Sequence, residues 1–228
     1  FGVGSVIGML SIGAGAREES LRLIEKLGVR NILVDSIAAT SPEELQQRRR
    51  ASQGLNERDV RILEANLDGD EALSPRRTLF PSRVLPKPSG SMPILQGVRP
   101  VFSVIHALSA AEGRLISAED DTSSAAVCMI GQSAKISLLG FDAAVGKKIK
   151  VNDTWLEVVG VLADQVADAA AGVKLQDRNN AIFIPLNTFQ YRFWDTTRFL
   201  KDELDGVDIR LKENVDSVQT AKILSAIL

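Results

Sequence analysis

The sequence predicts an α+β fold, because helical patterns prevail in its first 70 residues and strand patterns prevail in the second half of the chain. The two kinds of pattern are separated by a proline-rich stretch at residues 74–93. The chain has 228 residues, of which 45% are hydrophobic and 25% charged. This is enough to bury a sizeable core, and it favours one or two domains.

Residues 1–16 are apolar, glycine-rich and uncharged. The run is shorter than the roughly 20 residues that cross a bilayer, and no basic region precedes it as in a secretory signal. We therefore interpret residues 1–16 as the end of the first transmembrane helix of a longer protein. An unusually apolar soluble helix is the alternative. The helical pattern continues to Leu27, and Gly28 is a suitable C-terminal cap.

Helix-start signals recur in the next segment. A short strand is predicted at 31–34, a short helix after Ser41, and a longer helix after Asn56, which is a favourable N-cap residue. Leu55 can pack against Val60 at the start of this longer helix. Its predicted buried stripe consists of Val60, Leu63 and Leu67.

Strand patterns begin within the proline-rich stretch. An edge strand is predicted near 78–85, because proline is tolerated at sheet edges, and another strand is predicted at 96–105. Ser117 and Asp120 have the spacing of a capping box, which predicts a helix start.

A β-hairpin is the clearest local prediction. The turn Asn152-Asp153 pairs 148–151 with 154–159, which places Ile149 opposite Leu156 and Lys148 opposite Glu157. A buried strand is predicted at 181–185. Alternation at 207–212 predicts a half-buried strand, and a closing helix is expected at 215–228.

Composition excludes several classes of function. The net charge of −2 supplies no basic field for nucleic acid, so no nucleic-acid partner is predicted. The single cysteine, Cys128, cannot form an internal disulfide, and its apolar neighbours predict a buried side chain. A dinucleotide-binding loop at Gly2 to Gly8 would need a preceding strand, for which Phe1 leaves no room in this sequence.

No side chain stands out as a catalytic, cofactor-binding or metal-binding residue, and no cofactor is predicted. His106 is the only histidine and has no recognisable nucleophile near it, so we expect a polar residue at a strand end. The carboxylates of 119–121, Asp164 and Asp168 lack the pattern of a calcium loop and are expected at helix starts or in solvated loops. Two interpretations are open for the aromatic residues Trp155, Tyr191, Phe193 and Trp194. They could form a recognition surface, but burial beside strands is more common and is expected here.

Several segments, in this order, resemble the extracytoplasmic domain of MacB-type ABC transporter permeases, a family that includes FtsX-like proteins. The matching segments cover nearly the whole chain: GMLSIGAGAR at 8–17, IEKLGVRNILV at 24–34, EGRLISAEDD at 112–121, VCMIGQ at 127–132, VGKKIKV at 145–151, EVVGVL at 157–162 and FIPL at 183–186.

The resemblance implies a porter-like α/β subdomain formed by both chain ends, at 17–90 and 175–228, with a smaller β-rich subdomain inserted at 91–174. It also implies a further membrane helix after Leu228 and a location on the extracytoplasmic side of the cell membrane. The implied partners are a cytoplasmic ATPase, a second permease copy in a dimer, and a periplasmic adaptor or other envelope protein.

By the same resemblance, the domain is not an enzyme and couples cytoplasmic ATP hydrolysis mechanically to export. The alternatives are an FtsX-like scaffold that regulates an envelope hydrolase and a dinucleotide-dependent oxidoreductase.

Overall fold

The computed structural model describes residues 31–36, 54–66, 72–164, 178–193 and 203–212, together with Thr220 and Leu224. The predicted membrane segment at 1–16, the helix after Ser41 and most of the closing helix at 215–228 lie outside the described residues. None of the helices in the described part of the chain combines the length and the apolar character that crossing a bilayer requires.

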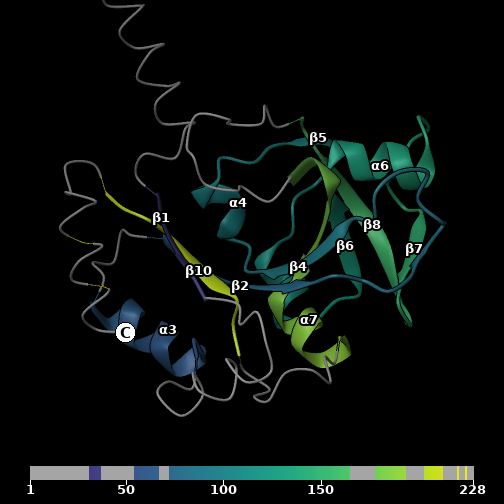
Figure 1. The fold of residues 1–228 in the computed structure, drawn as a ribbon. Helices are drawn as coiled ribbons and strands as arrows, with labels where there is room; N and C mark the ends of the chain where they lie inside the picture. Colours follow the sequence, from purple (N-terminus) through teal and green to yellow (C-terminus); the bar gives the residue numbers. More distant parts are fainter. Residues whose placement is uncertain are drawn as a thin grey trace, which may run out of the picture.

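Ten strands among the described residues form one mixed sheet in the order β1-β10-β2-β4-β9-β6-β8-β7-β3, and β5 pairs with β8 (Figure 1). The β4–β9 and β6–β8 pairs are parallel, and the others are antiparallel. The strands are β1 (Asn31–Asp35), β2 (Ala72–Leu79), β3 (Val84–Leu85), β4 (Ile94–Val98), β5 (Ala110–Gly113), β6 (Val127–Ile130), β7 (Lys148–Val151), β8 (Thr154–Leu162), β9 (Ala181–Pro185) and β10 (Gly206–Arg210). The helices are α3 (Glu57–Asn66), α4 (Phe102–Ile105), α5 (Ala118–Thr122), α6 (Gln132–Leu139), the 3₁₀ turn η2 (Arg178–Asn180) and α7 (Leu186–Arg192).

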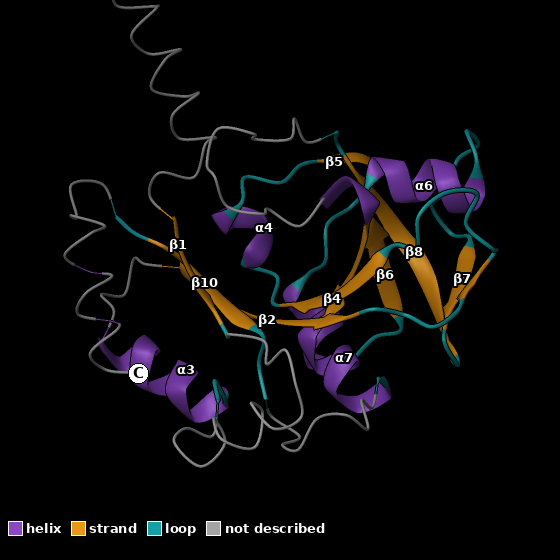
Figure 2. Ribbon diagram, viewed as in Figure 1, coloured by secondary structure: helices purple, strands orange, loops and turns teal. Residues whose placement is uncertain are grey.

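Both ends of the described chain meet in the three strands β1, β10 and β2. Figure 2 shows α3 on one side of these strands and α4 on the other. On the α3 side, Val60 and Leu63 pack with Val207 and Ile209 of β10 in a buried apolar cluster, which we call the chain-end cluster. Leu224 also belongs to this cluster. Its apolar contacts therefore join segments from opposite ends of the chain.

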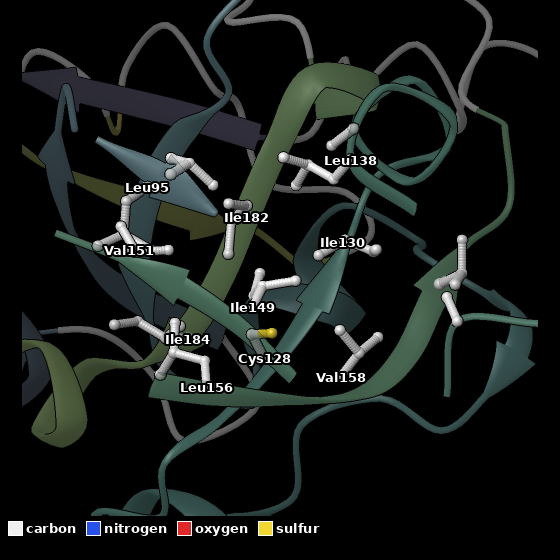
Figure 3. Close-up of a cluster of buried hydrophobic side chains, with 14 of the residues drawn as sticks. Leu95, Cys128, Ile130, Leu138, Ile149, Val151, Leu156, Val158, Ile182 and Ile184 are labelled. Atoms are coloured by element: carbon white, nitrogen blue, oxygen red, sulfur yellow. The ribbon is translucent and has the colours of Figure 1, made fainter. Parts of the chain in front are cut away.

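The middle of the chain forms the other part of the sheet, where alternate residues of one strand enter different clusters. Ile182 and Ile184 of β9 belong to a central cluster that also holds Cys128 and Leu156 (Figure 3). Phe183 belongs instead to a cluster with Phe102 of α4, which we call the α4 cluster. Strands with two buried faces explain the nearly continuous apolar runs in the sequence.

The strongest local predictions are confirmed. The hairpin of β7 and β8 has the expected register, with Ile149 opposite Leu156 and Lys148 opposite Glu157. The amides of Arg58 and Asp59 donate to Asn56 Oδ1, which is the expected cap of α3. The mixed arrangement of helices and one sheet confirms the α+β class.

Two strand predictions are wrong in extent. The strand expected at 78–85 is instead two strands: β2 lies inside the sheet between β10 and β4, whereas the two-residue β3 lies at the edge. The strand expected at 96–105 ends at Val98, and residues 102–105 form α4. Pro100 lies between the two elements, where proline favours a turn or the start of a helix.

The strand expected to be half-buried is buried on both faces. Val207 and Ile209 pack against α3, as the alternation predicted. Asp208, which was expected to face solvent, is also buried, because α4 covers the second face of β10. His106 lies at the C-terminal end of α4. The prediction that it would lie at the end of a strand is therefore wrong.

Candidate functional site

Five charged or titratable side chains gather on the α4 side of β1, β10 and β2. We call them the His106 cluster: His106 follows α4, Asp208 lies on β10, Arg178 begins η2, Arg76 lies on β2 and Asp35 ends β1. The side chains of His106 and Asp208 are only 4% and 3% exposed. Such a deeply buried pair of titratable side chains is unusual in a protein interior.

The contacts of His106 fix its tautomer. Arg178 Nη2 lies 2.9 Å from His106 Nδ1, and Asp208 Oδ2 lies 2.7 Å from His106 Nε2. Arginine can only donate, so Nδ1 must accept. The ring proton of the neutral imidazole is therefore on Nε2, which donates to the carboxylate of Asp208.

Two further contacts connect Asp208 to the edge of the sheet. Arg76 Nε lies 3.5 Å from Asp208 Oδ1, and Arg76 Nη2 donates to Asp35 Oδ1. Pairing with an opposite charge lowers the cost of burying Arg76 and Asp208. The cluster thus crosses β10, β2 and β1 on the face that α3 does not cover.

Side chains of the same strands also hold the end of α4. Arg210 Nη1 donates to the carbonyl oxygen of Val104 at 2.8 Å, and Asn31 Nδ2 donates to that of Ile105 at 3.0 Å. The last carbonyl groups of a helix lack partners within the helix. The carbonyl oxygen of Val104 also accepts from the backbone amide of Ala107 at 3.2 Å, and the donors from β10 and β1 add polar contacts that fasten α4 to the chain-end strands.

Burial lowers the pKa of His106 below its ordinary value. The hydrogen bond to Asp208 acts in the opposite direction, and the positive charges of Arg178 and Arg76 lower the pKa further. The net direction favours the neutral imidazole that the hydrogen bonds require. Geometry and electrostatics therefore agree on one protonation state.

This arrangement does not suit general-base catalysis. A general base needs a ring nitrogen within hydrogen-bond reach of the proton it removes, but both nitrogens of His106 already contact Arg178 and Asp208. Cys128 is the one cysteine of the chain, and burial raises the pKa of its thiol, which keeps it protonated. Within the described residues, the histidine, cysteine, aspartate and glutamate side chains form no group of three or more that could hold a metal ion.

A second polar cluster surrounds the start of α5. The guanidinium of Arg114 makes two hydrogen bonds to Asp120, and Asp120 also accepts from the backbone amide of Ser117 at 2.8 Å. Ser117 Oγ in turn accepts from the amide of Asp120, so the predicted capping box is present. Arg114 holds the pKa of Asp120 down at about 2. This carboxylate has a structural function at a helix start, as the sequence predicted.

The neighbouring residues of β5 fasten α6 to the sheet. Lys135 on α6 is buried and pairs with Glu112 on β5. The other carboxylate oxygen of Glu112 accepts from the amide of Ala144 at 3.3 Å. Because of the Lys135 contact, the pKa of Glu112 is lowered. The pair ties α6 and the loop that follows it to β5.

Two of the aromatic side chains are more exposed than expected. Trp155 is half exposed, with its ring near Lys150, and Tyr191 is 81% exposed. Phe193 is buried in the central cluster as expected. Trp194 and Asp168 lie outside the described residues, and Asp164 is exposed in a loop.

Sequence reasoning did not find the His106 cluster. His106 and Asp208 are separated by 102 residues and Arg178 is 72 residues from His106, so no local motif connects them. Asp208 gave no local signal, because it occupies a polar position in the alternating pattern of 207–212 and was therefore expected to face solvent.

Comparison with known proteins identifies relatives over nearly the whole chain. The model of the MacB-like periplasmic core domain matches residues 1–227. The macrolide export ATP-binding/permease protein MacB of Bdellovibrio bacteriovorus is 27% identical over 215 residues, which cover 94% of this chain and 31% of that protein. The MacB protein of Marinobacter nauticus is 26% identical over 227 residues, covering 95% of this chain and 32% of the relative. The chain thus spans about a third of the length of these curated relatives.

Solved structures agree with this match. The periplasmic region of MacB from Actinobacillus actinomycetemcomitans superposes with a TM-score of 0.66 at 17% identity, over 90% of this chain and 85% of that one. The extracellular domain of the ABC-type transporter YknZ from Gram-positive bacteria superposes with a TM-score of 0.58 at 17% identity, over 86% and 94%. The chain belongs to the family of MacB-like periplasmic core domains, and it is the extracytoplasmic domain of a MacB-like ABC transporter permease.

Proposed function

We propose that this domain is non-catalytic and transmits movement between the membrane and the extracytoplasmic space. In this proposal a cytoplasmic ATPase supplies the energy, a second permease copy completes a dimer, and the movement exports a substrate or acts on an envelope partner. The named relatives are macrolide export ATP-binding/permease proteins, which supports an ATPase in the same system.

One feature of the sheet carries the proposal. β10, from the end of the described chain, lies between β1 and β2, from its beginning, and pairs with each over five residues. In our proposal the segments before β1 and after β10 connect the domain to the membrane. A displacement of either segment then acts on the same three strands.

The sheet continues from these strands into the rest of the domain. β2 pairs with β4, and β4 pairs with β9, with all five residues of β9 buried. Close-packed interiors transmit displacement because they have few voids to absorb it. We propose that the chain ends at 17–90 and 175–228 act as the driven subdomain and that 91–174 is the inserted part presented to partners.

The occupied ring nitrogens of His106 and the protonated thiol of Cys128 support a non-catalytic function. Both groups would be the natural candidates for nucleophilic or general-base chemistry in this chain. Their contacts instead stabilise the fold.

The proposal is tested with Glu18→Pro in the full-length transporter. Glu18 lies outside the described residues, within the helix that the sequence predicts to run from residue 3 to 27, about 37 Å at ~1.5 Å per residue. Proline removes one helical hydrogen bond and costs about 3 kcal/mol locally. We expect normal membrane insertion and basal ATP hydrolysis but loss of export.

Glu18→Ala is the matched control, because it removes the same carboxylate and keeps the helix. It should export at the rate of the unmodified transporter. Export at that rate by correctly inserted Glu18→Pro protein would contradict mechanical transmission through this segment. The domain would then be a passive docking surface.

A further inference from the structure

The His106 cluster lies where the chain-end strands meet the rest of the domain. Asp208 sits on β10 between Val207 and Ile209, which belong to the chain-end cluster. The ring of His106 packs against the ring of Phe102, with 4.3 Å between the ring centroids, and Phe102 belongs to the α4 cluster. One imidazole therefore contacts both sides of this junction, and it is the only imidazole in the chain.

Protonation of His106 is incompatible with the observed contacts. The imidazolium carries a proton on both nitrogens, so Nδ1 becomes a donor and faces the donor Nη2 of Arg178 at 2.9 Å. The charged groups that act on the ring are Asp208 from β10, Arg76 from β2 and Arg178 from η2. α4 itself contributes the uncharged ring of Phe102. Arg76 is also paired with Asp35, and the positive charges of Arg76 and Arg178 both disfavour the imidazolium form of His106.

The turn that carries Arg178 is packed against another element. A Cβ atom on Gly131, the N-cap of α6, would overlap the carbonyl oxygens of Arg178 and Asn179. Asn180 Nδ2 donates to Ser91 Oγ at 2.8 Å. η2 is therefore in contact with the start of α6 on one side and with His106 on the other.

We propose that His106 is a proton-sensitive latch: the neutral ring holds η2 against α4 and β10, and protonation at Nδ1 expels the Arg178 guanidinium and releases η2 from this junction. The extracytoplasmic medium can change in pH, so the latch lets acidity alter the connection between the chain-end strands and the start of α6. This inference concerns the conformation of the domain and does not depend on the proposed mechanical function.

The difference in the pKa of His106 between the latched and the released state predicts how the opening equilibrium depends on pH. The released ring should titrate near the ordinary value of 6.5, whereas the latched ring has a lowered pKa. At pH values between these two pKa values, opening of the latch is therefore accompanied by the uptake of one proton by His106. The opening equilibrium should rise about tenfold for each pH unit below 6.5, until the pKa of the latched state is reached.

The first test is an NMR titration of the purified chain without a histidine tag, in which every imidazole signal belongs to His106. We expect the Nε2–H tautomer at pH 7.5 and a midpoint below 6.5. Arg178→Gln retains an N–H donor without the positive charge, so it should raise the midpoint above that of the unmodified chain. A midpoint at or above 6.5 in the unmodified chain, or an unchanged midpoint in Arg178→Gln, would overturn the latch.

The second test is hydrogen exchange of the amides in η2 at pH 7.5, 6.5, 5.5 and 4.5, corrected for the pH dependence of intrinsic exchange. His106→Gln is the control, because its amide can donate to Asp208 but does not titrate. We expect exchange in the unmodified chain to accelerate about tenfold per unit below pH 6.5, and no such acceleration in His106→Gln. Equal pH profiles in the two proteins would show that His106 is not the switch.

Discussion

Two charged clusters of similar chemistry differ in how far apart their members lie in the sequence. Arg114, Ser117 and Asp120 are within six residues of one another and form a helix cap that is visible as a local pattern. His106 and Asp208 are brought together only by the packing of α4 on β10. The first cluster therefore stabilises one helix start, whereas the second depends on how distant elements pack.

Asp120→Asn is expected to reduce stability at neutral pH. Asp120 is 10% exposed and its pKa is about 2, below the ordinary value of 3.8, chiefly because of its hydrogen bonds with Arg114. Because the folded-state pKa is depressed, the stabilisation is complete above about 3.8 and is lost as the pH falls through about 2. Arg114 is half exposed, so we discount the shift and expect a loss of about 1–2 kcal/mol at pH 7.

Urea unfolding at pH 7, 4 and 3 measures this effect. The difference between Asp120→Asn and the unmodified chain should shrink at pH 3, because Asp120 begins to be protonated in the unfolded state. Glu119→Gln removes an adjacent, exposed carboxylate and should change stability by less than about 0.5 kcal/mol. A difference that is equal at all three pH values would mean that the ionised pair is not the cause.

At the level of elements, prediction succeeded where neighbours in sequence pair with each other. The hairpin of β7 and β8 has a two-residue turn and complementary cross-strand pairs, which together fix its register. The strand β2 was predicted at a sheet edge, and too late in the sequence, because the stretch at 74–93 is rich in proline. The ladder with β4 begins only at Arg76, so Pro75 pairs with β10 alone, and the interior position of the remainder of β2 depends on strands far away in sequence.

Gly113→Ala tests the close pairing of β5 with β8. Gly113 has φ +68°, and a Cβ atom there would overlap the carbonyl oxygen of Val159, which accepts from the amide of Arg114. Alanine should therefore cost the left-handed strain and displace β5, a total loss of about 3 kcal/mol or more.

Gly146→Ala is the matched control, because Gly146 has φ +81° but no heavy atom within 4 Å of the added Cβ. It carries the backbone strain alone, about 1–2 kcal/mol. Denaturant midpoints of the two variants, compared at equal m-values, separate the steric contribution from the backbone contribution. Equal losses in the two variants would show that β5 moves away from β8 without cost.

For the whole molecule, the sequence predicted the fold class but not the order of the strands. The α+β class follows from local patterns and from the resemblance to a family, which the match over residues 1–227 confirms. The order β1-β10-β2-β4-β9 depends instead on pairings such as Asn31 with Arg210. Such pairings are selected by the burial of whole faces, which no single segment encodes. The His106 cluster lies on one of these faces, and this is why it escaped prediction.

The last prediction concerns assembly of the purified 228-residue chain. The large apolar side chains that are most exposed in the described residues are Phe80 after β2, Phe141 after α6 and Tyr191 on α7. Single exposed apolar residues are normal on monomeric proteins. We therefore expect the folded body to be monomeric, with weak association caused by the apolar residues 1–10 that the sequence assigns to a membrane helix. Sedimentation velocity of the chain with and without residues 1–10 should detect this association only in the longer protein, while both proteins unfold at the same temperature. A tight dimer that survives the deletion would show that the folded body itself contains a dimer interface.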